Sequence, residues 1–220
     1  VLPWLALSGC ADVKPHEKLH SVLWMRQSAE YHASTAQAYR TATESLKQAL
    51  ADPDKWPSAV EAQGPHGGKQ LAVIVDVDET VLDNSPAEVA NIKADRRAFD
   101  VEAWKQWEAK AEARAIDGAR NFLQFAASHG VAVFYVTNRF DEEAVRANLT
   151  KQQFPVDASE DVVRLQGECA GGDRSHDKEC RRQDIAAKYH VIFSACRGSP
   201  STSDSNGGGP MHHVGAGSGS

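Results

Sequence analysis

The sequence lacks two features that would point to a membrane or to a nucleic acid. No apolar run approaches the roughly 18 residues that a membrane-spanning helix requires. Basic residues are in deficit, with 24 Lys and Arg against 30 Asp and Glu and a net charge of -6, so no nucleic-acid partner is expected. An anionic substrate is not excluded, because a bound metal ion can reverse the field inside one pocket.

The first ten residues carry no charged side chain and end in a cysteine. Within them, Leu7-Ser8-Gly9-Cys10 resembles a bacterial lipobox, in which a signal peptide is cut before a cysteine that becomes lipidated. The start Met and the charged front of such a signal are missing, so residues 1–10 are interpreted as a signal remnant. We expect lipidation at Cys10 and anchoring in the bacterial cell envelope, on the periplasmic side of the outer membrane. The alternative is a short buried strand or helix with an ordinary core cysteine.

Three further cysteines are present, at positions 169, 180 and 196. In an oxidising periplasm Cys169 and Cys180 could pair across the Gly-rich turn between them. A zinc site that includes His176 is the alternative, although no CxxC or HxxxH spacing supports it.

The pattern of apolar residues predicts an α/β fold. The chain has 220 residues, of which 41% are hydrophobic, as expected for one such domain with appendages. Helical spacing over residues 19–50 predicts one long helix or two consecutive helices. Strands are predicted at 71–75, 131–136, 161–165 and 190–193, and helices at 117–128, 141–149 and 177–189. This alternation predicts a doubly wound parallel sheet, which binds ligands at the carboxyl ends of its strands.

Two carboxylates follow the first predicted strand. Asp76 and Asp78 lie two residues apart where a buried strand ends, and uncompensated charges there are costly. A divalent cation would compensate them, and hard oxygen ligands beside a phosphate suit Mg²⁺. The alternative is an acidic turn without function.

Three further polar residues lie at the end of a predicted strand or at the start of a predicted helix. Thr137 and Asn138 come directly after the second strand, where a hydroxyl could bind a phosphate oxygen held by the first strand. Lys178 opens the helix at 177–189. Taken singly, the first pair could be an ordinary turn and the lysine an ordinary solvated side chain.

Together these pieces resemble the haloacid dehalogenase superfamily. DVDET (76–80) is similar to its motif I, Thr137 to motif II and Lys178 to motif III. The match narrows to the bacterial class C acid phosphatases, lipoprotein phosphomonoesterases that include broad-specificity 5′-nucleotidases. It is carried by LWMRQSAEY (23–31), DVDETVLDNSP (76–86), FYVTNR (134–139) and DKECRR (177–182).

The resemblance implies a two-step phosphoryl transfer by a Mg²⁺-dependent acid phosphatase. Asp76 would be the nucleophile that forms an aspartyl-phosphate, and Asp78 the general acid and base. Mg²⁺ would be held by the Asp76 carboxylate and the Asp78 carbonyl. Thr137, Asn138 and Lys178 would bind phosphate oxygens.

The resemblance also implies a haloacid dehalogenase-like Rossmannoid core with an N-terminal helical segment and a small cap. Trp104 and Trp107 lie three residues apart where the family has its cap, and could stack on a nucleobase or nicotinamide ring. The alternative is that both pack the cap onto the core. The expected substrate is a small phosphomonoester, such as a nucleoside monophosphate.

The sequence departs from the family after the strand at 190–193. The family has a glycine-aspartate motif and a second acidic residue there, which complete the Mg²⁺ site, whereas Asp204 is the only acidic residue after Phe193. Reading the codons of residues 194–199 one base later permits Leu-Leu-Val-Gly-Asp. We therefore interpret 11–193 as an acid phosphatase domain that is incomplete at its C-terminal end. Residues 194–220, rich in Ser and Gly, are interpreted as a disordered or out-of-frame tail.

Two hypotheses from different classes follow. The chain is a phosphomonoesterase, or it is a catalytically inactive, lipid-anchored phosphate-binding or structural relic that lacks the last metal-binding motif.

Overall fold

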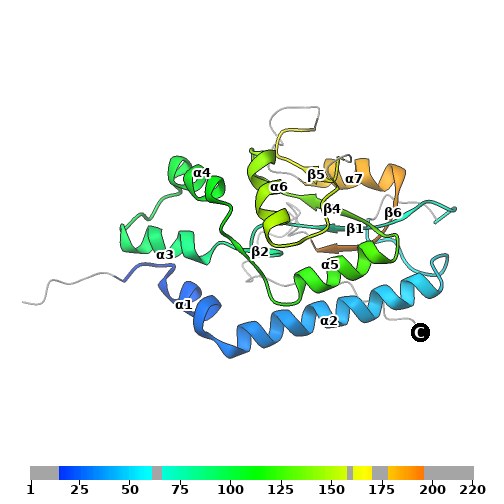
Figure 1. Cartoon of the computed structure of the whole chain (residues 1–220), viewed down its shortest axis with the longest axis horizontal. Coiled ribbons are helices and arrows are strands. Elements are labelled where there is room, and N and C mark those ends of the chain that lie inside the picture. Colours follow the sequence, from blue (N-terminus) through cyan, green and yellow to red (C-terminus); the bar gives the residue numbers. More distant parts are fainter. Residues whose placement is uncertain (1–14, 61–65, 158–160, 170–177, 196–220) are drawn as a thin grey trace, which may run out of the picture.

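A computed structural model describes residues 15–60, 66–157, 161–169 and 178–195 (Figure 1). The predicted lipidation site Cys10, His176, Cys196 and residues 196–220 lie outside this part of the chain. In chain order the elements are α1 (Leu19–Gln27), α2 (Ala29–Ala51), β1 (Leu71–Val75), β2 (Leu82–Asp83), α3 (Ser85–Lys93), α4 (Val101–Lys110), β3 (Arg114–Ala115), α5 (Ala119–Ser128), β4 (Ala132–Val136), α6 (Glu142–Lys151), β5 (Val163–Arg164), α7 (Glu179–Lys188) and β6 (His190–Ala195).

The N-terminal helical segment is two helices rather than one. Ser28 separates α1 from α2 in an extended conformation, and its hydroxyl accepts the N–H of Tyr31 at 3.2 Å, as an N-cap residue does. The long helix α2 runs beside α5 (Figure 1). From α2 the hydroxyl of Tyr39 donates to the carbonyl of Thr80 at 2.6 Å, so the helix supports the turn that follows β1.

Helix α2 approaches α5 closely at Gly118. This residue has a φ of +90°, and a Cβ atom there would lie 2.7 Å from the Cβ of Tyr39. Glycine is therefore required at this position both by its backbone conformation and by the packing.

The central sheet is parallel in the order β5-β4-β1-β6, with helices on both faces (Figure 1). All five residues of β1 are buried, as expected for a strand covered on both sides. In register, Val73 pairs with Val133 and Ile74 with Phe134. The predicted α/β fold with a doubly wound parallel sheet is confirmed.

Strand β6 is longer than the sequence predicts. It continues through Ser194 and Ala195, which pair with Ile74 and Val75 of β1. The first two residues of the predicted tail therefore belong to the sheet, because backbone pairing with a buried strand does not require apolar side chains.

A small cap, residues 85–110, leaves the core between two short antiparallel strands. Leu82 of β2 pairs with Ala115 of β3, and the cap helices α3 and α4 lie to one side of the sheet in Figure 1. The returning chain is held by α6, where the Asn148 amide accepts from the Ala113 N–H at 3.2 Å and donates to its carbonyl at 2.8 Å. Since Asn148 is 1% exposed, this anchor is shielded from water.

The helices that the structure describes include none with the length and apolar character to span a membrane.

Candidate active site

The predicted site residues meet at the carboxyl end of the sheet. Asp76 follows β1 and Thr137 follows β4, and these two strands are parallel neighbours. Lys178 precedes the first turn of α7, and its Nζ lies 2.5 Å from Asp76 Oδ1. Lys178 is 8% exposed, so its interpretation as an ordinary solvated lysine is wrong.

The Asp76 carboxylate is buried beside one positive and one negative charge. Its Oδ1 accepts the N–H of Val77 at 2.7 Å as well as contacting Lys178. Burial raises the pKa of Asp76, an effect that Lys178 opposes and the charge of Asp78 reinforces. The carboxylate is therefore only partly compensated by the side chains around it.

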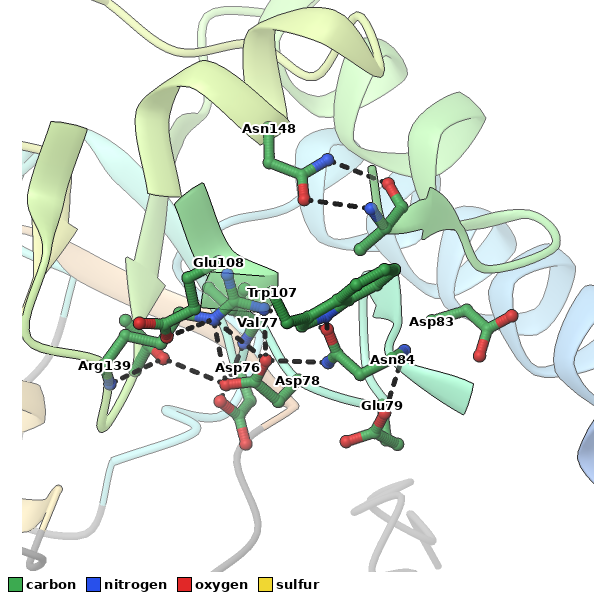
Figure 2. A network of polar contacts seen from close by, with 12 residues as sticks. Asp76, Val77, Asp78, Glu79, Asp83, Asn84, Trp107, Glu108, Arg139 and Asn148 are labelled. Atoms are coloured by element: carbon green, nitrogen blue, oxygen red, sulfur yellow. Dashed lines mark hydrogen bonds and ion pairs between the residues drawn. The ribbon is translucent and has the colours of Figure 1, made fainter. Parts of the chain in front are cut away.

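The Asp78 carboxylate is held by a buried arginine. Arg139 donates to Asp78 Oδ1 from Nη2 at 2.6 Å and from Nε at 3.0 Å (Figure 2). Asn84 donates to the same oxygen at 2.8 Å, and the Thr137 hydroxyl lies 3.4 Å from Oδ2. The oxygens of Asp78 are thus fixed in direction rather than free to rotate.

The two tryptophans of the cap both contact this network. Trp107 Nε1 donates to Asn84 Oδ1 at 2.8 Å, and the ring of Trp104 lies 5.5 Å from the guanidinium carbon of Arg139. These contacts support the interpretation that the tryptophans pack the cap onto the core. Stacking on a substrate ring stays a prediction.

A second buried arginine, Arg181, holds the end of β4. Its Nη1 donates to the carbonyl of Thr137 at 2.5 Å, and its Nη2 donates to Asn138 Oδ1 at 2.7 Å. Asn138 was predicted to bind phosphate, and the structure shows that its side-chain oxygen is committed to Arg181. Arg181 lies three positions after Lys178 and therefore on the same face of the helix, which is the signal that sequence reasoning missed.

Cys169 and Cys180 form a disulfide with a Cα–Cα distance of 6.3 Å. It joins the segment after β5 to the first turn of α7. The two sulfur atoms are used in this bond, so they are not zinc ligands.

The donor atoms at the end of β1 suit a hard cation. In the part of the chain that the structure describes, no three His, Cys, Asp or Glu side chains form a metal-binding cluster. Mg²⁺ does not require one, because it is commonly held by one or two carboxylates with water and substrate phosphate completing its shell. The partly compensated Asp76 carboxylate is a ligand of this kind.

The known proteins that this chain resembles are acid phosphatases. The family model of HAD superfamily, subfamily IIIB (Acid phosphatase), matches residues 11–196. A crystal structure of a class C acid phosphatase from Bacillus anthracis with tungstate bound is 29% identical with a TM-score of 0.67, covering 82% of this chain and 68% of that one. A second structure of the class C acid phosphatase from Bacillus anthracis is 30% identical with a TM-score of 0.65, covering 81% of this chain and 67% of that one.

Proposed function

Because this chain belongs to the acid phosphatases of HAD subfamily IIIB, we propose that it hydrolyses phosphate monoesters through an aspartyl-phosphate on Asp76. The observation that carries the proposal is the contact between Asp76 and Lys178, with the Arg139-bound Asp78 two residues away. In the proposed reaction these three side chains would serve as nucleophile, phosphate-binding cation and proton donor, and they lie near the end of one buried strand.

In the first step Asp76 attacks phosphorus and the bond from phosphorus to the ester oxygen breaks. Lys178 lies close enough to the Asp76 carboxylate to neutralise an oxygen of the transferring group and to orient it. Asp78 gives a proton to the departing alcohol oxygen. The products are an alcohol and a phosphoryl group bound to Asp76.

In the second step water hydrolyses the acyl-phosphate. Asp78, now ionised, accepts a proton from water as its oxygen attacks phosphorus, which releases inorganic phosphate and restores both aspartates. The fixed orientation of Asp78 by Arg139 and Asn84 suits a group that moves protons at one position in both steps.

Mg²⁺ is the proposed cofactor, with the Asp76 carboxylate and the Asp78 carbonyl as its protein ligands. It would neutralise charge on the transferring phosphoryl group. Burial raises the pKa of Asp76, and a cation at this carboxylate would oppose that effect and favour the ionised nucleophile.

The remaining expectations are also proposals. The substrate class is a small phosphomonoester, including nucleoside 5′-monophosphates whose base could contact the cap near Trp104. The chain is proposed to act in the bacterial cell envelope, anchored through a lipid on Cys10.

The test is hydrolysis of an aryl phosphate by the full chain across a Mg²⁺ titration. We expect Mg²⁺-dependent release of phosphate, with nearly complete loss in Asp76→Asn. The matched control is Asp54→Asn, because Asp54 has an 82% exposed side chain and takes no part in the site. Undiminished turnover by Asp76→Asn would refute the mechanism, and no turnover by the parent at saturating Mg²⁺ would refute the function.

A further inference from the structure

A buried ion pair joins the cap to the core beside Asp78. Glu108 of α4 is 4% exposed and Arg139 is 2% exposed. Their atoms Oε1 and Nε lie 3.4 Å apart, and both residues belong to the network of polar contacts drawn in Figure 2. Burial of two charges is costly, so such a pair is not explained by cap docking alone.

The guanidinium of Arg139 is shared between this glutamate and the proposed proton donor. Its Nε faces both Glu108 and Asp78 Oδ1, and its Nη2 bonds Asp78 Oδ1 at 2.6 Å and Asn84 Oδ1 at 3.1 Å. Glu108 and Asp78 therefore both attract the same nitrogen of the guanidinium, one through an ion-pair contact and the other through a hydrogen bond. The orientation of the guanidinium, and with it the direction of the Asp78 oxygens, is therefore set by Glu108 together with Asn84.

The pair is not optimised for stability. Among the described residues, Glu108 Oε1 and Arg139 Nη1 are buried atoms without a hydrogen-bond partner. A buried polar atom without a partner lowers stability, and an apolar contact at this place would dock the cap at lower cost. This arrangement fits a group that orients a catalytic neighbour better than one that only fastens the cap.

We propose that Glu108 is a positioning residue that acts through Arg139 to aim the Asp78 carboxyl at the leaving-group oxygen. The inference rests on the proposed function, because it assigns a task to the acid and base of that reaction. It also means that α4 must be docked for Asp78 to transfer protons efficiently.

A comparison of substrates with different leaving groups distinguishes this role from a purely structural one. A nitrophenolate leaves readily without a proton, whereas an alkoxide does not, so only alkyl phosphates depend strongly on the acid in the first step. Misdirection of Asp78 should therefore affect kcat/KM for an alkyl ester more than for an aryl ester. Loss of folded protein or of a docked cap should reduce both equally.

The experiment measures kcat/KM of Glu108→Gln with p-nitrophenyl phosphate and with glycerol phosphate at saturating Mg²⁺. We expect the loss for the alkyl ester to exceed the loss for the aryl ester at least about tenfold. Arg139→Lys should show the same bias. Glu102→Gln is the control, because it changes a 75% exposed carboxylate on the same helix. Equal losses on the two substrates, or no loss on either, would overturn the inference.

A second measurement does not depend on turnover. A thermal double-mutant cycle of Glu108→Gln and Asp78→Asn should be non-additive by at least about 2 °C, because both carboxylates hold the same guanidinium. Additive effects would overturn the inference even if the parent hydrolyses both esters. If the two substitutions are coupled but the parent hydrolyses neither ester, the proposed function is wrong. The Glu108–Arg139–Asp78 linkage then exists, but its catalytic role is overturned.

Discussion

Lys178 Nζ lies 2.5 Å from Asp76 Oδ1, across the junction between the end of β1 and the start of α7. Both side chains are largely buried, with 10% and 13% of their surface exposed. A charge pair with so little solvent is screened weakly, so each partner strongly affects the other. The relationship therefore predicts what removing the lysine should do.

Replacing Lys178 by Gln should reduce kcat/KM roughly 10²–10³-fold, because a cation aimed at the transferring phosphoryl group is removed. Steady-state kinetics with an aryl phosphate measure the loss. Lys188→Gln, an exposed lysine of the same helix, is the control and should leave kcat/KM unchanged. A loss below threefold for Lys178→Gln would contradict the assigned role.

Burial raises the pKa of Asp76, and this predicts a pH dependence of stability in the metal-free protein. A carboxyl whose pKa is higher in the folded state favours folding when protonated, and this contribution is lost as pH rises through the folded-state pKa. The Tm of the parent minus that of Asp76→Asn should therefore increase as pH falls from neutral toward about 4. Thermal melts in EDTA test this, and a difference that is constant or decreases on acidification would count against it.

Arg181 is expected to support the site through backbone and side-chain contacts. Arg181→Met should lower the free energy of unfolding by roughly 2–4 kcal/mol, because the buried carbonyl of Thr137 loses its donor. Urea denaturation measures the change. Gln183→Ala, an exposed position in α7, serves as the control, and equal stability of the two variants would show that Arg181 is dispensable.

The disulfide between Cys169 and Cys180 should stabilise the fold by about 2–3 kcal/mol, given its sequence separation of 11 residues. Reductant should lower the Tm of the parent and not that of Cys180→Ser. Because the bond fastens Cys180, which lies two residues after Lys178, the reduced protein should also lose kcat/KM. No change of the parent Tm on complete reduction would contradict the stabilising role.

The sequence alone was sufficient for the parts of the fold that depend on local pattern. The strand at 71–75 agrees with β1 because its β-branched residues are buried on both faces. Asp76 and Thr137 could be brought together in advance because parallel strands end at the same edge of the sheet, whereas Lys178 was grouped with them only through the resemblance to the family.

The roles of the arginines could not be predicted in this way. Arg139 and Arg181 are 2% and 1% exposed, and their burial depends on partners distant in sequence, such as Glu108 for Arg139. The two-residue strands β2 and β3 are also too short to carry a periodic signal, so the boundaries of the cap came only from the structure.

The central claim is that Asp76 becomes phosphorylated during turnover. It is tested most directly by mixing the full chain with an aryl phosphate and Mg²⁺, trapping with borohydride, and sequencing the peptides by mass spectrometry. The account predicts that Asp76 is reduced to homoserine only when substrate is present, and that Asp78 is unmodified. Steady release of phosphate with no modification at Asp76, or with modification at another residue, would contradict it.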